Sequence, residues 1–201
     1  MAYRIALAGN PNCAKTTLFN ELTGSKQHVG NWPGVTVDKK EGVYKKNKEV
    51  VILDLPGTYS LSPYSAEEIV ARDYIVKDKP DAVINIVDGA SIERNLYLSL
   101  QIMETRIPMV IAMNMMDEVE ARGDKIDCQK LSQVLGVPVV PIVARSGRGL
   151  TELMDAALRA AEKHEKPERM SLFGEDLENA IAGIADVLGD RDSDESWWKA
   201  I

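Results

Sequence analysis

A short apolar run over residues 3–8 leads directly into a glycine-started loop, and this junction restricts the fold more than any other feature of the sequence. The loop has the spacing G-x-x-x-x-G-K-[ST] from Gly9 to Lys15 and Thr16, except that Ala14 replaces the second glycine. Backbone N–H groups of such a loop, with the positive end of the following helix, bind phosphate groups. A chance Lys-Thr pair after an ordinary turn is the alternative interpretation of this motif alone. We expect these residues to contact a nucleotide: Gly9, Asn10, Pro11, Asn12, Cys13, Ala14, Lys15, Thr16 and Thr17.

The end of the first motif, together with a second motif at 54–57, supplies groups that a phosphate site requires. Lys15 would reach the β- and γ-phosphates, and the Thr16 hydroxyl would ligate Mg²⁺. Asp54 ends an apolar run at 49–53, where its carboxylate can hold a Mg²⁺-bound water. Gly57 can then offer its N–H to the γ-phosphate. The stretch Asp54, Leu55, Pro56 and Gly57 is therefore added to the nucleotide contacts, and Asp54 to the Mg²⁺ ligands.

The segment 24–36 is rich in Gly, Asn, Pro and Ser and is expected to form a long loop between these two motifs. Long loops inside compact domains are usually functional. Thr36 can close on Mg²⁺ and the γ-phosphate from this loop only when the triphosphate is present, with Gly34 and Val35 beside it. We therefore expect Thr36 to be a third Mg²⁺ ligand. The predicted catalytic residues are Asn12, Lys15, Thr36 and Gly57.

A third motif indicates which base is bound. Asp117 follows an apolar run at 109–113, and its carboxylate can accept both N1–H and N2–H₂ of guanine, a pair that adenine cannot supply. A site that depends on such a pairing discriminates strongly. Ala144 can offer its backbone N–H to guanine O6, although the hydroxyl that often supports this motif is missing. Met115 stands where a lysine often stacks on the base. The predicted base contacts are Asn114, Met115, Asp117, Val143, Ala144 and Arg145.

Strand-like and helix-like segments alternate along the first 165 residues. Strands are expected at 3–8, 35–44, 49–53, 82–87, 109–113 and 137–143, and helices at 16–22, 66–76, 93–105, 128–135 and 150–164. This predicts an α/β fold of the P-loop NTPase type, with a mostly parallel six-stranded sheet flanked by helices. A charged, proline-containing boundary at 163–170 precedes a small all-α appendage, with helices at 175–188 and after Ser193. We expect one domain at 1–165 and the start of a second at 166–201, cut from a longer chain.

The composition excludes several classes of protein. The formal net charge of −7 argues against a nucleic-acid interface, which needs clustered positive charge. No stretch reaches the ~18 apolar residues that a membrane-spanning helix needs, so the fragment is expected to be soluble. Cys13 and Cys128 lie in separate segments and offer no disulfide framework, which fits a reducing compartment.

Several longer motifs are more specific than the short ones above. They are GNPN at 9–12, VGNWPGVTV at 29–37, DLPGTYSL at 54–61, ERNLYL at 93–98 and NMMD at 114–117. Through them, residues 1–165 resemble the cytosolic G domain of the ferrous iron transport protein B family. The resemblance implies a regulatory domain that binds and slowly hydrolyses GTP at the cytoplasmic face of the bacterial inner membrane. Its partner would be the iron-permease membrane domain of the full-length protein, and a homo-oligomer of that protein is a further expectation.

The resemblance also extends to the appendage and to the mechanism. Residues 166–201 resemble the beginning of that family's helical domain, which is similar in role to a GDP-dissociation inhibitor. K⁺ activation is implied, with Asn12 coordinating K⁺ beside the phosphates in place of an arginine finger. Thr58 is too short to orient the attacking water, which would be held mainly by loop backbone, with Glu67 or Glu68 as helpers.

Ala14 is the main departure from the motif. If this position needs a positive φ, a Cβ costs about 1–2 kcal/mol, and it can also crowd the β-phosphate. We therefore expect weakened nucleotide binding or altered turnover. Two alternatives stay open: a nucleotide-binding module with impaired hydrolysis, and a ribosome- or RNA-associated GTPase, which the acidic balance disfavours.

Overall fold

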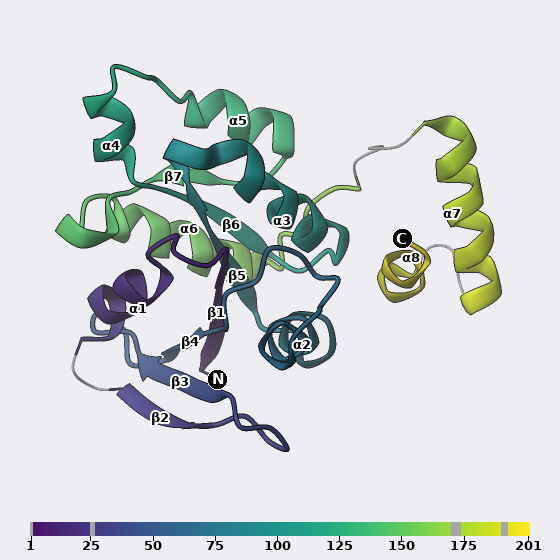
Figure 1. Ribbon diagram of the computed structural model, residues 1–201, viewed down its shortest axis with the longest axis horizontal. Coiled ribbons are helices and arrows are strands. Elements are labelled where there is room, and N and C mark those ends of the chain that lie inside the picture. The colour runs from purple at the N-terminus through teal and green to yellow at the C-terminus, as the bar shows by residue number, and fades with distance from the viewer. Residues whose placement is uncertain (1, 25–26, 170–173, 190–192) are drawn as a thin grey trace.

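The computed structural model describes residues 2–24, 27–169, 174–189 and 193–201, so the predicted 24–36 loop and 163–170 boundary fall partly outside the described residues. It has the expected α/β architecture, a mostly parallel sheet flanked by helices (Figure 1). The parallel strands are β1 (Tyr3–Gly9), β4 (Val50–Asp54), β5 (Ala82–Asp88), β6 (Met109–Asn114) and β7 (Val139–Pro141).

The sheet has seven described strands in the order β2-β3-β4-β1-β5-β6-β7, so the prediction of six was wrong. The extra strand is β2 (Gln27–Asn31), which lies in the segment expected to be loop and pairs antiparallel with β3 (Asp38–Val43). Four of the five β2 residues are exposed, so the strand has no alternating apolar pattern. Its backbone pairing with β3 creates it, which a sequence pattern does not reveal.

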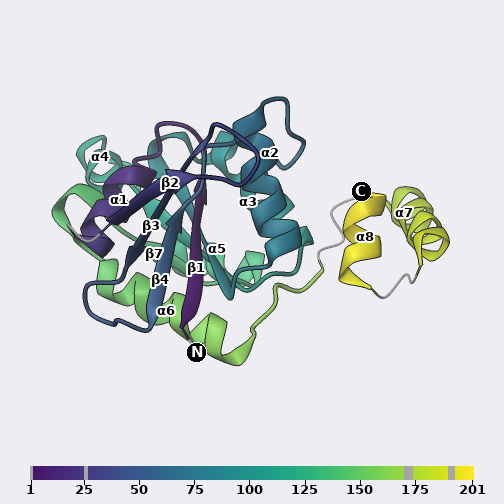
Figure 2. The same ribbon diagram turned by 90° about the horizontal axis from the view of Figure 1, so that it is seen from below.

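Helices cover both faces of the sheet, and alternate residues of β1 supply each face (Figure 2). Ile5 and Leu7 pack with α1 (Lys15–Thr23) and α6 (Leu150–Lys163). Ala6 and Ala8 belong to the opposite core, which receives α2 (Ala66–Asp73), α3 (Ile92–Glu104), α4 (Met116–Ala121) and α5 (Cys128–Leu135). Strand residues buried on both faces explain the continuous apolar runs that predicted these strands.

Short irregular helices complete this body. The π-helix η1 (Tyr74–Asp78) continues α2, while η2 (Gly89–Ser91) and η3 (Ala144–Ser146) are 3-10 turns. The sequence analysis did not predict α4, whose six residues are too few for a clear helical periodicity.

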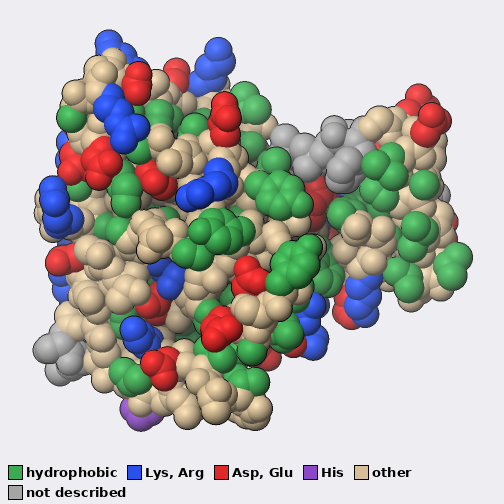
Figure 3. Space-filling model, in the orientation of Figure 1, with side chains coloured by type: hydrophobic (Ala, Val, Ile, Leu, Met, Phe, Trp, Pro, Cys, Tyr) green, Lys and Arg blue, Asp and Glu red, His purple; other side chains and the backbone are tan. Residues whose placement is uncertain are grey.

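The C-terminal helices α7 (Glu175–Leu188) and α8 (Asp194–Ala200) pack on each other and stand beside the sheet (Figures 1 and 2). In α7, Ile181, Ala182 and Ala185 are buried. Leu177, Ile184, Val187 and Leu188 are exposed, and hydrophobic side chains are visible over this lobe in Figure 3. Among the described residues, no helix is long and apolar enough to cross a membrane.

Candidate functional site

The predicted phosphate motifs meet at the carboxyl edge of the sheet, around a cavity of about 460 Å³. Parallel strands end together at this edge, so β1 and β4 deliver the two motifs to neighbouring positions. The cavity is lined by Asn10, Pro11, Asn12, Ala14, Lys15, Thr16, Thr17, Pro56, Gly57 and Glu67.

Lys15, Thr16 and Asp54 form a polar cluster beside this cavity. Lys15 Nζ lies 2.5 Å from Asp54 Oδ1, and the Thr16 hydroxyl donates to Asp54 Oδ2 at 3.1 Å. Asp54 is buried, with 6% of its surface exposed, so its charge is stabilised mainly by these partners. A hydroxyl and a carboxylate oxygen at one point are ligands that Mg²⁺ accepts, while Lys15 is a point charge suited to phosphate.

The loop between β1 and α1 contains two non-glycine residues with left-handed backbone. Asn12 has φ 68°, and Ala14 has φ 64° and ψ 31°. Ala14 therefore occupies the conformation for which the motif normally supplies glycine. Gly9 is required for a different reason, since a Cβ there would lie 2.7 Å from Cys13 Sγ and 2.9 Å from the Ile86 carbonyl oxygen.

The side chains of Asn10 and Cys13 point into the protein. Asn10 is 2% exposed and donates from Nδ2 to the Arg94 carbonyl at 3.4 Å, while its Oδ1 has no hydrogen-bond partner among the described residues. Cys13 is also buried, and burial raises the pKa of its thiol to about 11. Any nucleotide contact from Cys13 is therefore expected to come from its backbone.

Asn114 joins the phosphate loop to the predicted base-binding loop. Its Nδ2 donates to the Cys13 carbonyl at 3.1 Å, and its Oδ1 accepts the Ala144 N–H at 3.0 Å. The Ala144 N–H, predicted to contact guanine O6, is thus already used by Asn114 in this structure. The sequence analysis missed this bridge, since Cys13 and Ala144 lie 131 positions apart in the chain.

Asp117 lies in the first turn of α4, whose N-cap is Met115 with φ 61° and ψ 31°. Its Oδ2 is 3.7 Å from Arg145 Nη2. The Arg145 side chain is 87% exposed, so this ion pair is expected to contribute little to stability. Val143 is buried, so its side chain faces the core.

The loop after Asp54 is packed closely on the phosphate loop. A Cβ at Gly57 would lie 3.2 Å from Pro11 Cα. Thr58 is 1% exposed, and its N–H donates to the Gly9 carbonyl at 3.1 Å. Its hydroxyl donates to the Ser60 carbonyl at 2.5 Å, so this side chain holds the loop in shape.

Glu67 and Glu68, weighed as helpers for the attacking water, have different surroundings. Glu68 forms a capping box with Ser65 at the start of α2 and accepts the Tyr64 N–H at 2.9 Å. Glu67 lines the cavity. Glu67 is therefore the carboxylate better placed to act there.

Thr36 is exposed and is not among the residues that line the cavity, so the structure does not bring it to Asp54 and Thr16. Gly34 and Val35 are exposed beside it. The same loop is anchored at Trp32, which is 8% exposed and lies edge-on to Tyr74 with a centroid distance of 5.2 Å. The Trp32 N–H donates to the Val37 carbonyl at 2.9 Å, which closes the loop around Thr36.

Metal-binding capacity outside this site is limited. In the part of the chain that the structure describes, no group of three or more His, Cys, Asp or Glu residues could hold a metal ion. The Thr16 hydroxyl and the Asp54 carboxylate remain oxygen donors that meet beside the cavity.

Comparisons with known sequences agree with these motifs. A protein-family profile described as ferrous iron transport protein B matches residues 3–157. An Fe(2+) transport protein A/Fe(2+) transporter FeoB fusion protein of Porphyromonas gingivalis is 47% identical over 193 residues, covering 94% of this chain and 23% of that protein. The Fe(2+) transporter FeoB of Escherichia coli K12 is 44% identical over 191 residues, covering 92% and 24%. The chain thus spans about a quarter of the length of these relatives.

Solved structures resemble the whole described fold. A crystal structure of an S. thermophilus NFeoB mutant bound to GDP superposes with a TM-score of 0.91 at 46% identity, covering 98% of this chain and 77% of that chain. The cytosolic domain of T. maritima FeoB in a GDP form gives a TM-score of 0.90 at 43% identity, covering 100% and 80%. With the profile match over 3–157, these likenesses establish that the chain belongs to the ferrous iron transport protein B family, in which it corresponds to the N-terminal cytosolic G domain.

Proposed function

We propose that this domain binds GTP with Mg²⁺, hydrolyses it slowly, and regulates the ferrous iron permease of a longer protein at the cytoplasmic face of a bacterial inner membrane. The observation that carries the proposal is the Lys15–Asp54–Thr16 cluster beside a cavity rimmed by the phosphate loop. GDP in the matched S. thermophilus and T. maritima structures supports a guanine nucleotide as the ligand.

In this proposal each residue of the cluster has a separate role. Lys15 binds the β- and γ-phosphates as a point charge. Thr16 and Asp54 hold Mg²⁺, which when bound offsets negative charge on the β- and γ-phosphate oxygens. The start of α1 aims backbone N–H groups at the phosphates, aided by the helix dipole. Lys15 and Asp54 are paired at 2.5 Å, so phosphate binding must draw Lys15 away from the carboxylate.

Hydrolysis would rely on loop movement and on a monovalent cation. Thr36 is exposed in this structure, so it must move to reach Mg²⁺, and the Gly34 backbone with φ 79° lies within the segment that would rearrange. Gly57 already packs on Pro11 and can present its N–H near the γ-phosphate. Asn12 lines the cavity and would hold K⁺, whose fixed charge favours the developing negative charge.

Guanine recognition would rest on Asp117, whose carboxylate accepts from N1 and N2 of the base. Arg145 pairs with Asp117 in this structure, so its guanidinium must swing aside for the base to bind. Because Asn114 uses the Ala144 N–H, we assign the donor for guanine O6 to the backbone N–H of Arg145, the next residue.

Membership of this family supports a proposed role for each part of the chain within the full-length protein. Residues 1–165 would act as the G domain and 166–201 as part of a helical domain that transmits nucleotide state to the permease. A homo-oligomer of the full-length protein would be compatible with this arrangement, and nucleic acid is not an expected partner because of the net charge of −7.

GTP turnover in K⁺ against Na⁺ tests the proposal. We expect slow phosphate release that K⁺ stimulates and that Asn12→Ala reduces to the level seen in Na⁺. Lys15→Ala should abolish binding of a fluorescent GDP analogue, whereas Lys163→Ala, on the distant end of α6, should leave it unchanged. Equal turnover in both salts would overturn the role of K⁺, and unchanged GDP binding by Lys15→Ala would overturn the site.

A second function, nucleotide binding with impaired hydrolysis, is favoured by one observation. Ala14 has a left-handed backbone next to Lys15, where a Cβ can displace the phosphates. The two proposals differ in a single measurement. Tight GDP binding without turnover in either salt supports this second function, and recovery of turnover in Ala14→Gly would locate the cause.

A further inference from the structure

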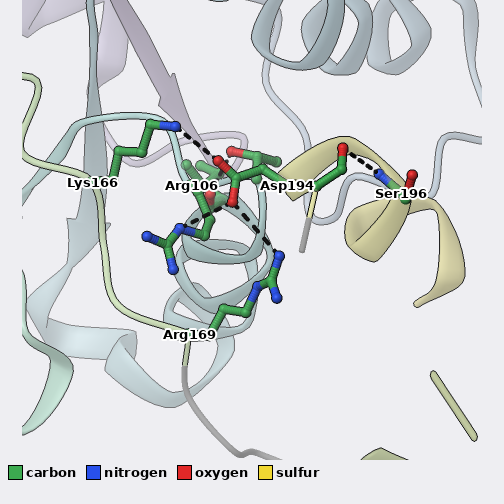
Figure 4. Close-up of polar contacts among 8 residues, drawn as sticks. Arg106, Lys166, Arg169, Asp194 and Ser196 are labelled. Carbon is green, nitrogen blue, oxygen red and sulfur yellow. Dashed lines mark hydrogen bonds and ion pairs between the residues drawn. The ribbon is translucent and has the colours of Figure 1, made fainter. Parts of the chain in front are cut away.

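Asp194, the first residue of α8, is shared by three cations from other parts of the chain (Figure 4). Its Oδ2 lies 2.8 Å from Lys166 Nζ, and its Oδ1 lies 3.2 Å from Arg106 Nε and 3.7 Å from Arg169 Nη2. Arg106 follows α3, whereas Lys166 and Arg169 belong to the segment after α6. One carboxylate therefore connects α8 to the turn after α3 and to the segment that follows α6.

The local backbone at Asp194 and at Arg106 positions these two side chains for their ion pair. Ser193 caps α8, with its hydroxyl accepting the Ser196 N–H at 3.4 Å, which fixes Asp194 in the first helical turn. Arg106 has φ 56°, a left-handed conformation that costs about 1–2 kcal/mol for a side chain with a Cβ. That cost indicates that the surrounding contacts hold the turn after α3 in place.

The shared carboxylate differs from an ordinary surface pair. A single exposed ion pair contributes little, but Asp194 is 31% exposed and three cations meet at it. Removing the carboxylate would break three ion pairs at once, leaving Glu104 as an acidic group that still interacts with Arg106 and Arg169. The loss is therefore expected to exceed that of any one pair.

The two tryptophans of α8 add further contacts beside the Asp194 ion pairs. The Arg169 guanidinium lies 4.5 Å from the Trp197 ring centroid, and the Trp197 side chain hydrogen-bonds the buried carboxylate of Glu104, on α3. Trp198 packs against the hydrophobic core that includes Leu61. α8 is thus fixed to the end of α3 by charge and to the core by Trp198.

The loop after Gly57 contacts α3 and shares a cavity with α8. The Leu61 N–H donates to Gln101 Oε1, on α3, at 2.7 Å. Leu61, Gln101, Glu104 and Trp198 line one cavity of about 520 Å³. α8 and residues 61–63 of the 58–63 loop therefore line the same pocket.

We propose that Asp194 is an electrostatic clasp that holds α8 beside the 58–63 loop, so that opening the clasp frees α8 and loosens this loop. The clasp consists of ion pairs within the chain, so it operates without a bound nucleotide. Residues 194–200 would then lose the contacts that hold them to the rest of the chain, so their amide hydrogens would exchange faster.

Hydrogen–deuterium exchange of the 201-residue chain without nucleotide tests the clasp, comparing Asp194→Asn with Glu195→Gln. Glu195 is the matched control, because it is also an acidic residue of the first turn but pairs with Lys199 inside α8 at 2.8 Å. We expect exchange in α8 and in the 58–63 loop to rise at least about tenfold in Asp194→Asn and less than about twofold in Glu195→Gln, with β1 and β5 unchanged.

The partner side of the clasp gives an independent test. Arg106→Gln, far from α8 in sequence, should raise exchange in both segments, and combining it with Asp194→Asn should add little. Raising NaCl should accelerate α8 exchange in the wild type but not in Asp194→Asn. Equal effects of Asp194→Asn and Glu195→Gln, no effect of Arg106→Gln, or faster exchange in α8 alone would each overturn the proposal.

Discussion

Ala14→Gly separates two consequences of a Cβ in the phosphate loop. Ala14 has φ 64° and ψ 31°, a left-handed conformation that costs an alanine about 1–2 kcal/mol. Glycine removes this cost but gives the unfolded chain more freedom, which returns roughly 0.4–1 kcal/mol. We therefore expect a net gain on the order of 1 kcal/mol in the free energy of unfolding, or about 2–4 °C in Tm for a domain of this size.

Nucleotide affinity responds to a different part of the same substitution. Backbone strain is present with and without nucleotide, so relieving it cancels from the binding free energy. Only crowding between the Cβ and a phosphate is specific to the complex. If crowding amounts to about 1 kcal/mol, Ala14→Gly tightens GDP binding roughly fivefold.

Thermal unfolding and titration with a fluorescent GDP analogue measure the two effects separately. His164→Gly is the matched control, since His164 has φ 50° and ψ 41° at the end of α6 and does not line the cavity. It should raise Tm similarly and leave GDP affinity unchanged. A Tm for Ala14→Gly at or below that of the wild type would refute the strain argument, and an unchanged affinity would refute crowding.

Four further predictions concern Asn114, Cys13 and Gly149. Asn114→Ala should lower the free energy of unfolding by about 2 kcal/mol or more in urea, because the Cys13 carbonyl and the Ala144 N–H lose their partner; a loss below about 0.5 kcal/mol would contradict the bridge. Burial raises the pKa of the Cys13 thiol to about 11, so at pH 8 its thiolate is roughly 100-fold scarcer than that of an ordinary thiol, and Ellman's reagent should label it only after unfolding. Burial favours the neutral Cys13 thiol in the folded state, so this thiol should not lower the free energy of unfolding below about pH 9. As the pH rises towards 11, the thiol ionises more readily in the unfolded chain, and the free energy of unfolding should decline. Unfolding curves across that range can check this. Gly149→Ala should cost at least about 3 kcal/mol in the same urea assay, since its Cβ would lie within van der Waals overlap of the Pro141 carbonyl oxygen at a φ of 79°, and a soluble variant of near wild-type stability would contradict this.

The sequence by itself determined the parallel strands and the order of the site motifs. Continuous apolar runs such as 82–87 and 109–113 predicted β5 and β6, because strands buried on both faces carry no polar alternation. Asp54 and Asn114 could be placed at the carboxyl edge because each ends such a run. Site residues that adjoin a strand in the chain can thus be recognised from the sequence.

Only the tertiary structure decided which donors and acceptors are already used. β2 exists through its pairing with β3, the Ala144 N–H is taken by Asn114, and Thr36 lies outside the cavity despite its suitable chemistry. The convergence of three cations on Asp194 likewise depends on residues distant in sequence. Hydrogen bonds and ion pairs join groups by spatial proximity, whereas residue type and spacing record only what each group is able to do.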